Sequence, residues 1–195
     1  GHSARRASAR SLPMNLPQLR LLGPGELSLD GRPVRLHSER TLALLAYLAL
    51  ESDRPHTRKR LAALLWGDLD EGAARQSLRQ ALYSLRGVAQ GQLGAALQAD
   101  HDLVRLLPDH HLHVDVLEFL AFLAGPDEVP WGTAARQYRA PLLEGRRFDR
   151  CAEYQAWLEA ARGRLHARAM QNLDRLALSS MARAAWEAAL GWAKA

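Results

Sequence analysis

The chain has 195 residues, with 26 Lys and Arg against 21 Asp and Glu, a formal net charge of +5 and 48% hydrophobic residues. This hydrophobic fraction supports one or two folded cores and argues against an intrinsically disordered chain. The net charge permits an anionic partner without requiring one. The single cysteine, Cys151, excludes an internal disulfide and the cysteine pairs of a zinc finger. No apolar run approaches the roughly 20 residues of a membrane span, so we expect a cytoplasmic protein with no membrane contact.

The first predicted elements are short strands that follow a polar leader. Residues 1–17 are small, polar and basic, and Gly1-His2-Ser3 is typical of a cloning remnant, so we expect a disordered leader there. Alternating apolar residues then predict three strands, at residues 19–22, 26–29 and 32–36. Asp30-Gly31 is a strong signal for a tight hairpin turn between the last two. The chain is therefore predicted to open with a small antiparallel sheet.

Two helices are predicted next. The first covers residues 41–51 and is almost wholly apolar, which indicates the buried central helix of a domain. The second covers residues 58–66 and carries Arg58, Lys59 and Arg60 in its first turn. The caps predicted for these helices are Ser38 and Thr57. A helix N-terminus with free amides and several cations favours phosphate binding; the alternative is a solvated basic turn.

The third predicted helix covers residues 70–88 and carries two faces of different chemistry, with Asp70 as its cap. Apolar residues recur at spacings of three and four and form one stripe: Ala74, Leu78, Ala81, Leu82 and Leu85. The other side carries two polar rows, Arg75, Arg79, Tyr83 and Arg86 beside Gln76 and Gln80. Because arginine pairs with guanine edges and glutamine with adenine edges, this acid-free face favours recognition of a DNA major groove. The alternative is an ordinary surface helix in an arginine-rich protein.

A second hairpin is predicted from strands at residues 95–99 and 103–107. The segments LRLLGPGELSLDGRPVRL, RTLALLAYLAL, RKRLAALLWGDLDEGAARQSLRQALYSLR and HVDVLEFLAFL closely resemble the Streptomyces antibiotic regulatory protein family. That resemblance implies a mainly α fold with small β sheets. It places an OmpR-type winged helix-turn-helix at residues 18–112 and a tetratricopeptide-like bacterial transcriptional activation domain at residues 113–195.

The resemblance also implies function. It places Arg75, Gln76, Arg79 and Gln80 in the major groove of double-stranded DNA, and it implies an activator that binds promoter direct repeats as two copies and recruits RNA polymerase. The other DNA contacts expected are Thr57, Arg58, Lys59, Tyr83, Arg86 and Arg105. At the wing, Asp100 and Asp102 would repel phosphate, which leaves His101 and Arg105 as the only wing candidates. The alternative function is a helical scaffold or adaptor whose winged helix binds protein.

The second half is predicted to be all helical. Helices are expected at residues 114–123, 131–138, 153–178 and 181–192. Their predicted core positions are Tyr154, Trp157, Leu158, Leu165, Leu173 and Leu176. Because no heptad seam is visible, we expect a monomer in the absence of DNA. The last helix stops without a polar capping repeat, so we expect the chain to be a fragment of a longer protein.

Other chemistry finds little support in the sequence. The cluster from Asp109 to Asp115 holds three histidines, but histidines in a polar linker explain it better than a metal site. Arg146, Arg147 and Arg150 stand near Cys151 and could depress its pKa, although a lone thiol is expected to be inert. There is no phosphate-binding GxxxxGK loop and no GxSxG serine motif. We therefore expect no enzyme activity, no metal and no cofactor.

Overall fold

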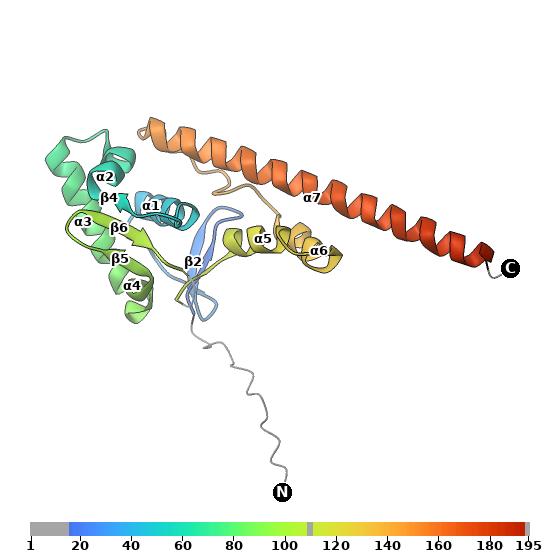
Figure 1. The fold of residues 1–195 in the computed structure, drawn as a ribbon. Helices are drawn as coiled ribbons and strands as arrows, with labels where there is room; N and C mark the ends of the chain where they lie inside the picture. Colours follow the sequence, from blue (N-terminus) through green and yellow to red (C-terminus); the bar gives the residue numbers. More distant parts are fainter. Residues whose placement is uncertain (1–15, 109–110, 194–195) are drawn as a thin grey trace, which may run out of the picture.

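The computed structural model describes residues 16–108 and 111–193 (Figure 1). The expected leader, except for its last two residues, lies outside this range, as do Asp109 and His110 of the histidine cluster. The first sheet has the strand order β3-β2-β1-β7. Its strands are β1 (Gln18–Arg20), β2 (Glu26–Leu29), β3 (Arg32–Pro33) and β7 (His113–Val114). β1 pairs antiparallel with β2 and parallel with β7, which was not predicted.

The predicted hairpin between β2 and β3 is confirmed. Asp30 and Gly31 have φ values of 52° and 74°, and a two-residue turn with positive φ at both positions matches the twist of the flanking strands. The third strand is shorter than predicted and ends at Pro33. Proline has no N–H to donate to a ladder, and only the Val34 N–H to Leu27 O bond of 2.8 Å continues the pairing.

The three predicted helices of the first half are confirmed. They are α1 (Glu39–Leu50), α2 (Arg58–Trp66) and α3 (Glu71–Gly87). Each begins after its predicted cap, because the side-chain oxygens of Ser38, Thr57 and Asp70 accept backbone N–H groups of the first turn. α1 is buried from Thr41 to Ala49 and forms the centre of the core.

The second hairpin forms the wing. β5 (Leu97–Ala99) and β6 (Leu103–Leu106) pair antiparallel, and β4 (His56–Thr57) completes a sheet of order β4-β6-β5. The prediction of strand from residue 95 is wrong: α4 (Gln92–Ala96) follows the 3-10 turn η1 (Val88–Gly91). Leu93 and Ala96 are both fully buried and stand at helical spacing. Strands, three helices and a wing together make a winged helix-turn-helix.

The second half contains α5 (Asp115–Leu123), α6 (Glu128–Gln137) and α7 (Ala152–Ala193). The predicted break near Ser179 and Ser180 is wrong, since α7 is one helix of 42 residues. The Ser179 hydroxyl bonds to the Glu128 carboxylate, so it does not compete for the backbone of its own helix. Leu173 is 47% exposed and is not a core residue, because its neighbour Asn172 occupies the buried position. Overall the fold is mainly α with two small sheets.

The two halves share one core at the first sheet and α1. Leu21 N–H and Leu22 N–H donate to the carboxylate oxygens of Asp115, at 2.8 and 3.0 Å. Burial raises the pKa of Asp115, while these backbone donors oppose the rise. At the other end of the interface, the Tyr154 hydroxyl donates to Ala43 O at 2.8 Å. The predicted boundary after residue 112 thus falls directly before β7, a strand of the first sheet.

Replacing Asp115 by alanine is expected to lower the free energy of unfolding by about 1–3 kcal/mol, because the N–H groups of Leu21 and Leu22 lose their acceptors. Urea unfolding followed by circular dichroism measures the loss. The matched control is Glu118→Ala on the same helix. Glu118 contacts His113 at 2.6 Å, but both side chains are over a third exposed, so its removal should cost less than about 1 kcal/mol. Equal losses in the two variants would contradict this role for Asp115.

Candidate nucleic-acid interface

α3 buries one face and exposes the other, as its sequence predicts. The predicted apolar stripe is buried along its whole length, and it comprises Ala74, Leu78, Ala81, Leu82 and Leu85. The polar residues predicted to contact DNA are all exposed, namely Arg75, Gln76, Arg79, Gln80, Tyr83 and Arg86. A helix fixed by its apolar stripe presents these side chains on a rigid support.

The N-terminus of α2 lies beside this face. Thr57 Oγ1 accepts Arg60 N–H at 3.1 Å and caps the helix. Arg58 N–H donates to Asp102 O, and Arg58 Nε donates to Asp100 O, both at 2.8 Å. Arg58 therefore ties the start of α2 to the tip of the wing. Lys59 is exposed and forms no ion pair within the described part of the chain, which leaves its ammonium available to an anion.

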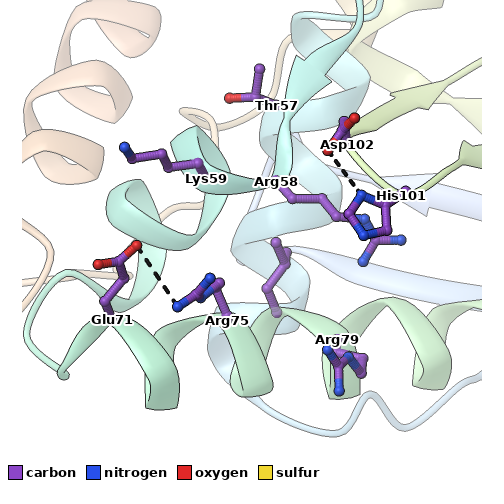
Figure 2. A pocket seen from close by; sticks show the side chains of 9 residues that line it. Thr57, Arg58, Lys59, Glu71, Arg75, Arg79, His101 and Asp102 are labelled. Carbon is purple, nitrogen blue, oxygen red and sulfur yellow. Dashed lines mark hydrogen bonds and ion pairs between the residues drawn. The ribbon is translucent and has the colours of Figure 1, made fainter.

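A groove of about 800 Å³ separates α2, α3 and the wing tip (Figure 2). Its lining consists of Thr57, Arg58, Lys59, Glu71, Arg75, Leu78, Arg79, His101 and Asp102. The structure thus brings five predicted contact residues into one concave surface: Thr57, which caps α2, Arg58 and Lys59 of α2, and Arg75 and Arg79 of α3. It also brings His101, the wing-tip residue named from the sequence, to the same groove.

Two acidic side chains reduce the positive charge of this groove. Glu71 Oε1 lies 3.9 Å from Arg75 Nη2, one helical turn away, and both side chains are well exposed. Asp102 Oδ1 lies 3.0 Å from His101 Nδ1 at the wing tip. The sequence analysis described the polar face of α3 as free of acidic residues because it placed Glu71 only at the helix N-terminus. The spacing of four residues between Glu71 and Arg75 is nevertheless the usual signal for an ion pair on one helix face.

Two hydrogen-bonding arrangements leave the groove accessible to an anion: a weak contact of Arg79 and the engagement of the Asp100 carboxylate within the hairpin. Arg79 Nη1 donates to Gln76 Oε1 at 3.4 Å, a long contact between two exposed side chains of the same face. Asp100 Oδ1 accepts the N–H groups of Leu103 and Asp102, and these bonds hold the pKa of Asp100 below its usual range. The Asp100 carboxylate therefore closes the hairpin tip and is absent from the groove lining.

The five other predicted contact residues lie outside the groove lining, namely Gln76, Gln80, Tyr83, Arg86 and Arg105. Gln80 lines a second depression beside Arg40 and Asp68, and Tyr83 is 81% exposed further along α3. Arg86 Nη2 donates to Ala99 O at 3.1 Å, whereas Arg105 donates to Ser52 O at 3.0 Å and to Asp53 O at 3.2 Å. Both arginines bind loop or wing backbone in the free protein, and their contact with DNA stays a prediction.

The fold is similar to that of a solved structure, Mycobacterium tuberculosis EmbR in complex with a low affinity phosphopeptide. The TM-score is 0.53 at 24% sequence identity, and the match covers 91% of this chain and 47% of the EmbR chain. The chain therefore spans about half the length of that protein. No protein-family model and no curated protein matches it. The likeness agrees with the predicted fold, a winged helix followed by helices.

The remaining titratable clusters are structural. Cys151 Sγ donates to Leu65 O at 3.1 Å, and burial raises the pKa of the Cys151 thiol. The suggestion that neighbouring arginines depress this pKa is therefore wrong, because Arg147 pairs with Asp149 and Arg146 with Glu39 instead. Among the described residues, no group of three or more His, Cys, Asp or Glu could hold a metal ion, and no described helix is long and apolar enough to cross a bilayer.

Proposed function

We propose that this protein is a sequence-specific DNA-binding transcriptional regulator, an activator, that reads the major groove with α3. One observation carries the proposal: Arg75, Gln76, Arg79 and Gln80 are all exposed on a helix whose opposite stripe is fully packed. These side chains match the hydrogen-bonding edges of guanine and adenine. A short turn at residues 67–70 joins α2 to α3, which is the arrangement of a helix-turn-helix.

In this proposal, residues of α3 contact the bases and residues at the start of α2 contact the phosphates. Arg79 lies near the middle of the 17-residue helix α3, where a helix in a groove comes nearest the bases. Thr57, Arg58 and Lys59 lie at the start of α2, which crosses the DNA backbone in a helix-turn-helix. The Arg58 and Arg60 N–H groups are already bonded to Asp102 O and Thr57 Oγ1. The exposed Lys59 ammonium and the positive end of the α2 dipole remain to attract a phosphate oxygen.

The regulatory part of the proposal rests on the family resemblance. It assigns two copies side by side on promoter direct repeats, roughly one helical turn (about 10 bp) apart, and a helical half that recruits RNA polymerase. The likeness to EmbR supports the fold on which this resemblance depends. The mass of the complex on a minimal operator tests the stoichiometry, and one protein per operator would contradict it.

A second function is favoured by the two acids in the groove. Glu71 and Asp102 face the surface that would meet phosphate, and they would suit a winged helix that binds a protein within a helical scaffold. The two functions differ in their dependence on salt. Binding to DNA releases counterions, so retention on duplex DNA should fall steeply as salt increases.

Replacing Lys59 by alanine tests the phosphate contact. We expect weaker binding to cognate and random duplexes alike, and a salt slope smaller by about one unit, because one phosphate contact is lost. The matched control is Arg164→Ala, which removes one exposed positive charge from α7, outside the groove. It should leave the slope unchanged. If the parent protein shows no salt-dependent affinity for duplex DNA, the proposed function is wrong and the scaffold function is favoured.

A further inference from the structure

Tyr83 is a large aromatic side chain that α3 leaves exposed. It is 81% exposed, whereas Leu69 and Leu103, the other large apolar side chains exposed in the described winged half, are 41% and 38% exposed. Within residues 16–108 and 111–193, Tyr83 forms no hydrogen bond, ion pair or ring contact. The three other tyrosines each contact another aromatic ring. The Tyr83 ring therefore contributes little to the packing of the free protein.

Tyr83 lies on the side of α3 that faces away from the core. At 3.6 residues per turn, Gln76, Gln80 and Tyr83 are the side chains of α3 that point most nearly opposite its buried stripe. Arg79 lies at the flank of this group. Gly87, one turn after Tyr83, has no side chain, and a Cβ added there would meet no atom within 4 Å. The ring is thus open on that side and stands among the side chains that the proposed function assigns to the bases.

The chemistry of this ring complements that of its neighbours. Arginine and glutamine side chains bind the polar edges of guanine and adenine. In the major groove the C5-methyl group of thymine is the apolar group that a base pair presents, and apolar side chains contact it. A tyrosine ring offers a rigid apolar face, while its hydroxyl at the tip can stay in water. Tyr83 therefore adds an apolar contact to a face of α3 that is otherwise polar.

We propose that Tyr83 is a specificity-determining residue that reads the 5-methyl group of a thymine in the operator. This inference rests on the proposed function, since it needs α3 in the major groove. Tyr83 follows Arg79 by four residues, about 6 Å along the helix axis, and successive bases of a strand are about 3.4 Å apart along the duplex. The thymine is therefore expected about two base pairs from the guanine assigned to Arg79.

The hydroxyl of Tyr83 offers a different contact, a hydrogen bond to a phosphate oxygen, which would carry no sequence information. The methyl contact is favoured by position, because Tyr83 points away from the core, where a helix in a groove meets the base edges. The two contacts use different parts of one side chain. Phenylalanine keeps the ring and removes the hydroxyl, so one substitution distinguishes them.

Deoxyuridine substitution tests the methyl contact, because uracil lacks only the C5-methyl group of thymine. A site is first selected from a pool of random duplexes with the parent protein, and each thymine in it is then replaced singly by deoxyuridine. We expect one replacement, about two base pairs from the guanine whose preference Arg79→Ala relaxes, to weaken parent binding about fourfold, the effect of removing one buried methyl-sized group. A selected site with no thymine at that distance, or equal affinity for the thymine and deoxyuridine duplexes there, would overturn the inference.

Variants of Tyr83 assign the effect to its ring. Tyr83→Ala should bind the thymine and deoxyuridine duplexes equally, whereas Tyr83→Phe should keep the difference between them. Gln76→Ala, on the same face two turns earlier, is the matched control and should also keep it. Both positions are exposed, so circular dichroism should show unchanged helix. If Tyr83→Phe binds the thymine duplex as weakly as Tyr83→Ala, the hydroxyl makes the contact and the inference is wrong.

The outcomes separate this inference from the proposed function. If selection with the parent protein enriches no duplex, the proposed function fails at that step and the inference fails with it. If a site is enriched and its guanine preference depends on Arg79, the proposed function stands whether or not the methyl group matters. The ratio of the affinities for thymine and deoxyuridine duplexes then decides the role of Tyr83 alone.

Discussion

Replacing Tyr154 by alanine is expected to lower the free energy of unfolding by about 3–5 kcal/mol, a large share of the roughly 5–15 kcal/mol that stabilises a typical domain. The Tyr154 ring is fully buried. It packs edge-on against Phe148 at 4.9 Å and tilted against Trp157 at 5.2 Å, centroid to centroid. Its hydroxyl donates to Ala43 O in α1, and burial keeps the pKa of Tyr154 well above its usual value, so the donor stays protonated.

Tyr154→Phe is the matched control for this variant. It keeps the ring in place and removes only the hydrogen bond to Ala43, so it should cost about 1 kcal/mol. Urea unfolding followed by circular dichroism gives both values. Because Tyr154 joins α7 to the central helix of the winged half, we also expect one cooperative transition for the described fold. Equal losses in the alanine and phenylalanine variants would show that the ring contributes little packing and would contradict this account.

Replacing Arg79 by alanine is expected to cost about 1–3 kcal/mol in affinity for the cognate duplex and to relax preference at one base pair. Arg79 lines the groove and lies near the middle of the exposed face of α3. It donates to Gln76 Oε1 at 3.4 Å, a long hydrogen bond that a base edge can replace. Arg75 should show a smaller loss, because Glu71 lies 3.9 Å from it and competes for the guanidinium.

Binding to cognate and scrambled duplexes across a salt series measures these losses, on a site selected from a pool of random duplexes. The melting temperature of Arg79→Ala should stay close to that of the parent, since the side chain is exposed. Arg164→Ala again controls for the loss of one charge. If Arg79→Ala binds the cognate duplex as tightly and as selectively as the parent, the assignment of α3 fails. If Lys59→Ala loses selectivity but keeps its salt slope, the two roles are reversed.

The helices of the winged half could be predicted from local signals. Ser38, Thr57 and Asp70 cap α1, α2 and α3 in the structure, and a side-chain oxygen that accepts an N–H of the first turn acts over three residues only. The buried stripe of α3 follows from its spacing alone. The exposed arginines and glutamines of the same helix follow as its remaining positions, which is why the candidate site could be placed before its surroundings were known.

Features that depend on distant parts of the chain could not be predicted. β7 exists because His113 and Val114 meet β1, almost a hundred residues earlier. α7 continues through Ser179 because Glu128 of another helix takes the hydroxyl. Arg105 was predicted from the sequence to contact DNA at the wing. In the structure the carbonyl oxygens of Ser52 and Asp53 accept its N–H groups. In each case the structure depends on a contact with a residue far away in the sequence, which a local sequence pattern cannot identify.

Methylation protection of a bound duplex tests the central claim most directly, namely that α3 lies in the major groove. Dimethyl sulfate attacks guanine N7 in the major groove and adenine N3 in the minor groove. We predict that the parent protein protects guanine N7 within its selected site, and that Arg79→Ala loses protection at one guanine while its neighbours stay protected. Protection confined to adenine N3, or no protection at all on a duplex that the protein binds, would contradict the account.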